Sequence, residues 1–173
     1  EEKNYLQSKD DIILLSGVVN GLKRLQARGY LLFIVSNQSG IARGFFDEKK
    51  VQELNDYLLK TLQSEGVIIE KIYYCPHHKD GVIKEYAIDC ECRKPKTGMI
   101  KKILNDYSID LKTSFFIGDK MTDVELGNNC NSNSILVLTG YGKKEVEKGN
   151  NLSFTVASDL SDAADQIIGK NNS

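Results

Sequence analysis

Short apolar runs alternate with amphipathic stretches along the chain, and this alternation constrains the fold more than any other feature. The runs expected to form strands are 30–35, 69–74, 115–117, 135–138 and 154–157. Between them, apolar residues recur at helical spacing in the stretches 18–25, 51–62, 99–107 and 160–168, and a short helix is expected at 120–130. Strands that alternate with helices predict a parallel sheet with helices on both faces. We therefore expect an α/β fold with a three-layer, Rossmann-like parallel sheet and no separate cap domain.

Local signals refine this prediction. Asp47 and Thr97 stand where helix N-caps are expected, before the stretches 51–62 and 99–107. The longest apolar run, Tyr30 to Val35, is typical of a strand buried on both faces. It is far shorter than the roughly 18 residues that a membrane span needs.

Composition bounds the class of protein. The chain has 173 residues, 40% of them hydrophobic and 27% charged, which fits one soluble domain over 1–169 with a frayed tail at 170–173. A net charge of −1 argues against a general nucleic-acid binder, and nothing indicates a membrane partner. The first eleven residues lack the apolar stretch of a signal peptide, which favours the cytoplasm.

Two polar clusters follow predicted strands, where ligands of parallel sheets bind. The first contains Ser36, Asn37, Gln38 and Ser39. Its hydroxyls, amides and loop N–H groups suit a phosphate, with Arg43 able to close over the anion. Such loops are common, however, and the alternative is a solvated loop with a solvated arginine.

The second cluster contains Asp119 and Asp123 in Gly118-Asp119-Lys120-Met121-Thr122-Asp123. One carboxylate at a strand end and one a helical turn later can hold Mg²⁺, directly or through water. The alternative is that one aspartate simply caps the helix. A third candidate is the basic pair Arg93 and Lys94, which could aim positive charge at one oxyanion or could be ordinary surface.

Four residues in the segment 75–95 have the spacing of a metal site. Cys75 and His77 form one C-x-H pair, and Cys90 and Cys92 form a C-x-C pair. Alternate residues of an extended segment point the same way, so the two pairs can offer three sulfurs and one nitrogen to one Zn²⁺. His78 is the alternative nitrogen ligand. Four protein ligands predict a structural zinc that pins this loop, and Cys130 is expected to be a packed residue.

The motifs together resemble the haloacid dehalogenase superfamily of phosphatases, over nearly the whole chain. Within it, they are most similar to the group of heptose bisphosphate and histidinol phosphatases. The resemblance rests on residues 36–44 (SNQSGIARG), 73–78 (YYCPHH), 90–95 (CECRKP) and 118–120 (GDK). The second and third motifs are specific in combination, because few other phosphatases of this superfamily carry that zinc loop.

The resemblance implies a function and a role for each matching residue. The implied reaction is Mg²⁺-dependent removal of the 7-phosphate of D-glycero-D-manno-heptose 1,7-bisphosphate, in the supply of nucleotide-activated heptose, by a monomeric enzyme. The implied contacts to the phosphoryl group and the rest of the substrate come from Ser36, Asn37, Gln38, Ser39, Arg43, Arg93, Lys94 and Lys120. Lys94 would neutralise the phosphoryl charge, Asp119 would bind Mg²⁺, and Asp123 would orient the site.

One departure from the family pattern stands out. The family's nucleophile is the first aspartate of an Asp-x-Asp motif on the first strand, and the second aspartate is its general acid/base. The sequence contains no such motif, and Asp10-Asp11 has the wrong spacing. We therefore expect an N-terminally incomplete copy of a phosphatase, inactive as given, in which the strand at 30–35 has an unpaired edge.

Two other functions stay open at this point. A histidinol-phosphate phosphatase would use the same scaffold on a different substrate. A zinc-stabilised binding module without catalysis would need neither the missing motif nor the phosphate loops.

Overall fold

The computed structural model describes residue 5 and residues 8–147 and 152–170. Its strands are β1 (Phe33–Asn37), β2 (Lys71–Cys75), β3 (Phe115–Gly118), β4 (Asn133–Val137) and β5 (Thr155–Ala157). Its α-helices are α1 (Val18–Ala27), α2 (Ser39–Ala42), α3 (Glu48–Ser64), α4 (Gly98–Asp106), α5 (Met121–Asn129), α6 (Gly142–Glu147) and α7 (Leu160–Lys170). Two 3₁₀ turns, η1 (Lys9–Asp11) and η2 (Leu111–Thr113), complete the list.

The strands are parallel throughout, as predicted, but they form two sheets. In the first sheet β1 pairs with β2, and in the second β4 lies between β3 and β5. The register places Asn37 opposite Cys75, so β1 and β2 end side by side. Residues after these strands therefore start from the same edge of the sheet.

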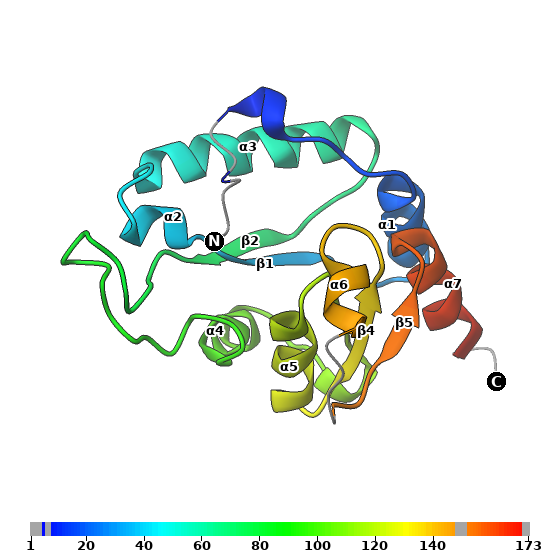
Figure 1. Ribbon diagram of the computed structural model, residues 1–173. Helices are drawn as coiled ribbons and strands as arrows, with labels where there is room; N and C mark the ends of the chain where they lie inside the picture. The colour runs from blue at the N-terminus through cyan, green and yellow to red at the C-terminus, as the bar shows by residue number, and fades with distance from the viewer. Residues whose placement is uncertain (1–4, 6–7, 148–151, 171–173) are drawn as a thin grey trace.

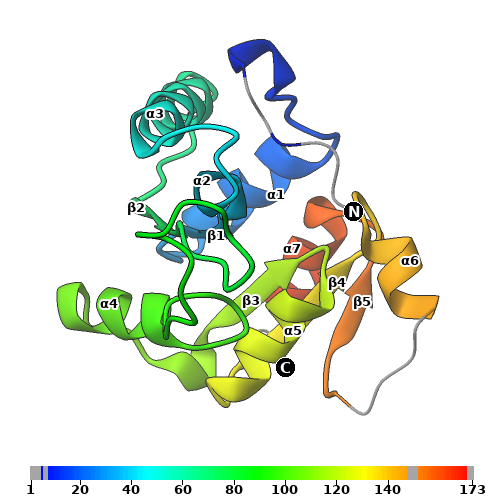
Figure 2. The same ribbon diagram turned by 60° about the vertical axis from the view of Figure 1, so that its left-hand side comes forward.

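Helices cover both faces of the strands, which gives the predicted three layers (Figures 1 and 2). One core joins α1, α3 and α7 to β4 and β5 through buried residues that include Leu25, Leu62, Ile135, Ala157 and Ile167. A second joins α4 and α5 to β2 through Tyr73, Met99, Ile103 and Leu126, and a smaller third packs α5 on β4 through Val124 and Leu136. The loop 76–97 contains no helix or strand, as expected for a segment held by other means.

A wide apolar cavity separates the two sheets. Among the described residues, β1 pairs only with β2 and β3 only with β4, so each has one edge without a strand partner. Both strands line the same cavity of about 970 Å³, with Phe33, Ile34, Val35, Phe115, Phe116 and Ile117 in its wall. The unpaired edge expected for the strand at 30–35 is thus present in the structure.

Several local predictions need correction. The first strand begins at Phe33 rather than Tyr30, and it is half-buried rather than buried on both faces, because one edge borders the cavity. Leu31, in the predicted strand, is 51% exposed. Thr97 occupies the N-cap position of α4, but its backbone is not extended and its hydroxyl makes no capping bond. Asp47, by contrast, caps α3 by accepting the Lys50 N–H at 2.8 Å.

Other differences lie between the predicted elements. The short helices α2 and α6 were not expected from the sequence, since each is too short to show a period. The C-terminal residues 171–173 of the predicted frayed tail lie outside the described part of the chain, whereas Lys170 ends α7. No helix among the described residues is both long and apolar enough to cross a bilayer.

Close contact between α1 and α7 gives a first prediction. A Cβ built on Gly21 would lie 2.5 Å from the Leu160 carbonyl oxygen, whereas one built on Gly169 would meet nothing within 4 Å. We expect Gly21→Ala to push the helices apart and to lower the free energy of unfolding by about 1–3 kcal/mol. Gly169→Ala should leave it unchanged or raise it by up to about 1 kcal/mol. Urea denaturation of the two variants tests this, and equal effects would contradict it.

Candidate active site and metal centre

Lys94 joins the carboxyl ends of the two sheets. Its ammonium donates to the Val35 carbonyl in the middle of β1 at 2.8 Å and to Asp123 Oδ1 in α5 at 2.6 Å. The Lys94 and Asp123 side chains are only 13% and 15% exposed. A pair so shielded holds its geometry, because an isolated charge at this depth is costly.

Asn37 fixes the backbone of Lys94 from the end of β1. Its Oδ1 accepts the Lys94 N–H at 2.9 Å, and its Nδ2 donates to the Lys94 carbonyl at 3.1 Å. The peptide bond from Lys94 to Pro95 is cis. This two-point contact bridges 57 residues of sequence and sets where the lysine side chain starts.

Asp119 and Asp123 both line the cavity between the sheets, together with Lys94. Asp119 follows β3 directly, and its Oδ2 accepts the Tyr141 N–H at 2.9 Å. Asp123 accepts the Lys120 N–H at 3.2 Å through Oδ2, so it caps α5 and binds Lys94 at once. The capping interpretation of this motif thus applies to Asp123. The Asp119 carboxylate at a strand end has the oxygen chemistry that Mg²⁺ requires.

The remaining predicted site residues are placed with different partners. The Gln38 amide donates to Ser36 Oγ at 3.1 Å, which keeps both beside Asn37. Ser39 is buried at the start of α2, and its hydroxyl contacts that of Tyr5 at 3.3 Å rather than Lys94. The Lys120 ammonium lies over the Tyr141 ring, 4.4 Å from its centroid. Arg43 and Arg93 lie beside the metal cluster described next.

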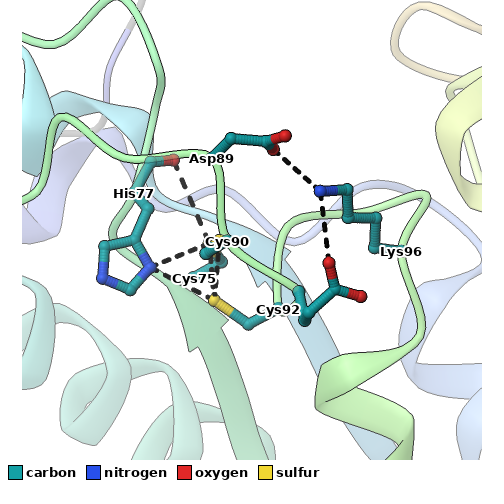
Figure 3. Close-up of polar contacts among 7 residues, drawn as sticks. Cys75, His77, Asp89, Cys90, Cys92 and Lys96 are labelled. Atoms are coloured by element: carbon teal, nitrogen blue, oxygen red, sulfur yellow. Dashed lines mark hydrogen bonds and ion pairs between the residues drawn. The ribbon is translucent and has the colours of Figure 1, made fainter.

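Four donor atoms meet where β2 ends and the loop after it begins (Figure 3). They belong to Cys75, His77, Cys90 and Cys92, and all lie within 4.8 Å of one another. The three sulfurs are 2.9–3.4 Å apart, and His77 Nδ1 is 3.3 Å from Cys92 Sγ. None of these cysteines is in a disulfide. Three thiols and an imidazole at this separation fit one tetrahedral Zn²⁺.

The geometry distinguishes between the two histidines. His77 Nδ1 faces the sulfurs, whereas the His78 ring lies against Arg43, with Nε2 3.4 Å from Nη2. Burial lowers the pKa of His78, and the charges of Arg93 and Arg43 lower it further. Within the cluster, burial raises the pKa of the Cys75 thiol, as does its contact with Cys92. Cys130 lies away from this cluster, packed beside α4 and α5, as expected.

Polar contacts also hold the second half of the loop. Lys96 binds Asp89 at 2.8 Å and Glu91 at 3.4 Å on either side of Cys90 (Figure 3). The Lys96 ammonium lowers the pKa of Asp89. These pairs are largely exposed, so they orient the loop more than they stabilise it.

Sequence reasoning missed three features of this site. The Val35 carbonyl binds Lys94, but backbone acceptors leave no mark in a sequence. Gly140, at φ +58°, lets the chain pass against Asp119, since a Cβ there would overlap the carboxylate. The two glycines of Gly140-Tyr141-Gly142, directly after a predicted strand, were an available signal. The third feature is the contact of the His78 ring with Arg43.

Comparison with known proteins shows the class to which this protein belongs. A family model described as HAD-hydrolase-like matches residues 91–163. The chain is also similar to a solved D,D-heptose 1,7-bisphosphate phosphatase from B. bronchiseptica in complex with magnesium and phosphate. That structure aligns with a TM-score of 0.86 at 30% identity, over 98% of this chain and 92% of the other. The protein is therefore an HAD-like hydrolase in fold and in sequence.

Curated relatives narrow the family. The chain is 40% identical to D-glycero-alpha-D-manno-heptose-1,7-bisphosphate 7-phosphatase of Photorhabdus laumondii, over 91% of this chain and 88% of the relative. It is 39% identical to the beta-heptose counterpart from Pasteurella multocida, over 97% of this chain and 90% of the relative. The chain belongs to the family of D-glycero-D-manno-heptose-1,7-bisphosphate 7-phosphatases within the HAD-like hydrolases.

The cluster gives a second prediction. We expect about one zinc ion per purified chain, and Cys92→Ser to reduce the zinc content to near zero, because a four-ligand structural site tolerates the loss of a thiolate poorly. The same variant should unfold at a lower urea concentration, since metal binding and folding are coupled. Cys130→Ser is the matched control, and it should keep its zinc. Atomic emission measures the metal, and equal zinc in both variants would refute the assignment.

Proposed function

We propose that this chain is the phosphatase scaffold that hydrolyses D-glycero-D-manno-heptose 1,7-bisphosphate at its 7-phosphate. The observation that carries the proposal is that Lys94, Asp119 and Asp123 line the same cavity, with the Lys94 ammonium bound to Asp123. A cation, a carboxylate suited to a metal and a hydroxyl from Ser36 are the groups that phosphoryl transfer requires. The names of the relatives supply the substrate.

Each residue has a distinct role in this proposal. Ser36 and the N–H groups after β1 hold the phosphoryl oxygens. Asn37 acts mainly by positioning Lys94, because its amide already binds the lysine backbone on both sides. Lys94 neutralises the charge of the phosphoryl group and of the attacking carboxylate. Asp123 in turn holds the lysine ammonium at the mouth of the cavity.

Two metal ions serve different purposes in the proposal. The Asp119 carboxylate is the ligand for Mg²⁺, which when bound would offset charge on the transferring phosphoryl group. Tyr141 N–H orients that carboxylate. The Cys75, His77, Cys90 and Cys92 cluster holds Zn²⁺ away from the reaction, with no open coordination position. Its purpose is to fix the loop that carries Arg93 and Lys94.

The nucleophile comes from the family pattern and not from the residues described. In that pattern an aspartate oxygen attacks phosphorus and forms an aspartyl phosphate, while the second aspartate of Asp-x-Asp protonates the leaving sugar oxygen. Water then hydrolyses the acyl phosphate. The sequence given contains no Asp-x-Asp motif. We place the reaction at the cavity between β1 and β3, beside Lys94 and Asp119.

Turnover tests the proposal directly. We expect the chain, extended at its N-terminus by a strand that carries Asp-x-Asp, to release phosphate from heptose 1,7-bisphosphate in the presence of Mg²⁺. The matched control carries Asn-x-Asn and should release none, because an amide is no nucleophile for phosphorus. Both anomers and histidinol phosphate are assayed beside it. Preference for histidinol phosphate would make that compound the substrate instead of the heptose bisphosphate. No phosphate release from any of these compounds would refute the proposal.

The role of Asp119 gives a further prediction for the same extended chain. Asp119→Asn should lower kcat/KM by roughly a hundredfold or more and remove its dependence on Mg²⁺, because the metal loses its anionic ligand. Asp106→Asn is the control, since Asp106 forms an exposed pair with Lys71 at 3.1 Å away from the cavity. Magnesium titration of the initial rate measures both. An unchanged Mg²⁺ dependence in Asp119→Asn would place the metal elsewhere.

A further inference from the structure

Both ring nitrogens of His78 face hydrogen-bond donors. Nδ1 lies 3.2 Å from the backbone N–H of Asp80, and Nε2 lies 3.4 Å from Nη2 of Arg43. A neutral imidazole has one acceptor nitrogen only, and an arginine side chain has none. One of the two contacts therefore pairs a donor with a donor.

The shorter contact is the matched pair, so the longer contact is the mismatched one. The Asp80 N–H belongs to a turn in which Gly81 N–H also donates to the His78 carbonyl, so it has a fixed direction. Nδ1 is then the acceptor, and Nε2 carries the ring proton. On the Nε2 side, an N–H of His78 and an N–H of Arg43 then face each other, and neither group can accept.

Arg43 has a second unused donor. Its Nε is buried and has no hydrogen-bond partner among the described residues. A buried donor without an acceptor costs free energy that a protein normally avoids. The unpartnered Nε, together with the N–H groups of His78 and Arg43 that face each other, makes a place rich in donors that suits an oxyanion.

Backbone contacts hold the two side chains in this arrangement. Arg43 follows α2 directly, and the Ala42 carbonyl before it accepts both the Val82 and Ile83 N–H groups, at 2.7 and 2.9 Å. His78 N–H donates to the Tyr86 carbonyl at 3.1 Å. The loop 78–86 is thus tied to the end of α2, and little reorganisation is needed before an anion binds.

The donors are linked to the proposed reaction site through the loop that carries Lys94. Arg93 precedes Lys94 in the chain, and its guanidinium donates to the His77 carbonyl at 3.2 Å, next to His78. The surroundings of the donor pair are therefore cationic. The carboxylate of Asp80 lies 3.9 Å from Nδ1, on the side of the ring away from Arg43.

We propose that His78 is a specificity residue, whose Nε2–H binds, together with the Arg43 guanidinium, the phosphate of a sugar bisphosphate that is not hydrolysed. This inference rests on the proposed function. A phosphate monoester presents three acceptor oxygens and a charge of about −1.5 to −2 at neutral pH, which complements two N–H groups and an arginine. The site selects bisphosphates over monophosphates without touching the reacting phosphorus.

Two substitutions at His78 separate anion binding from loop structure. Asn carries an acceptor near the position of Nδ1 but no donor near Nε2, so His78→Asn keeps the Asp80 turn and loses the ligand donor. Gln carries a donor near Nε2 and no acceptor near Nδ1, so His78→Gln does the reverse. Lys79→Ala removes a neighbouring positive charge and controls for general electrostatics.

The measurement is calorimetric titration of the chain, in Mg²⁺ buffer, with heptose 1,7-bisphosphate and with heptose 7-phosphate. The ratio of the two Kd values reports the second phosphate alone. We expect His78→Asn to reduce the preference for the bisphosphate roughly tenfold, the size for one hydrogen bond to a charged group. His78→Gln and Lys79→Ala should keep it within about threefold. Zinc content and circular dichroism of each variant verify the fold.

A second variant keeps the test valid if a His78 variant misfolds. Arg43→Met should reduce the preference roughly thirtyfold, and His78→Asn should add little in that background, because the two donors share one anion.

Loss of the bisphosphate preference in His78→Gln but not in His78→Asn would overturn the inference, because His78 would then act only by holding the Asp80 turn. Binding of the 7-phosphate with no preference for the bisphosphate would overturn the inference alone. Binding of neither ligand would also overturn the inference, whereas the turnover of the extended chain decides the proposed function separately.

Discussion

The contact of Lys94 with both sheets is the constraint on which the site depends. The ammonium is bound to the middle of β1 through the Val35 carbonyl and to α5 through Asp123, and all three residues line the cavity between the two sheets. The same ammonium would bind a phosphoryl group in the proposed reaction. The Lys94 side chain therefore serves both the contact between the two sheets and the chemistry of the site.

The metal cluster extends this constraint to the rest of the substrate. The segment 76–97 has no regular secondary structure, and a free loop of that length would lose any positioning to conformational entropy. Cys75 anchors the cluster in β2, and Cys92 is two residues from Lys94. One bound ion would therefore hold the lysine, Arg93 and His78 relative to the strand ends. A structural metal can in this way set specificity without contacting the substrate.

The layered fold was predicted from the periodicity of apolar residues. The main difference from that prediction, the division of the strands into two sheets, depends on which strand edges pair. Five strands, five of the longer helices and the parallel direction were predicted from runs such as 115–117 and 160–168. Periodicity reports which face of an element is buried, but it does not report which strands are neighbours. The separation of β1 from β3 and the half-buried state of β1 depend on pairing across the cavity. A shift of the first strand to Phe33–Asn37 has the same cause.

Amino-acid identity and spacing alone were enough to select the four zinc-ligand candidates, the loop at Ser36 and the carboxylates at Asp119 and Asp123, because their chemistry depends on residue type over short separations. Only the tertiary structure decided that His77 faces the sulfurs while His78 faces Arg43. Adjacent residues of an extended chain point to opposite sides, and which side meets the arginine depends on a loop bound to a helix 40 residues earlier. Long-range contacts of that kind have no local signal in the chain.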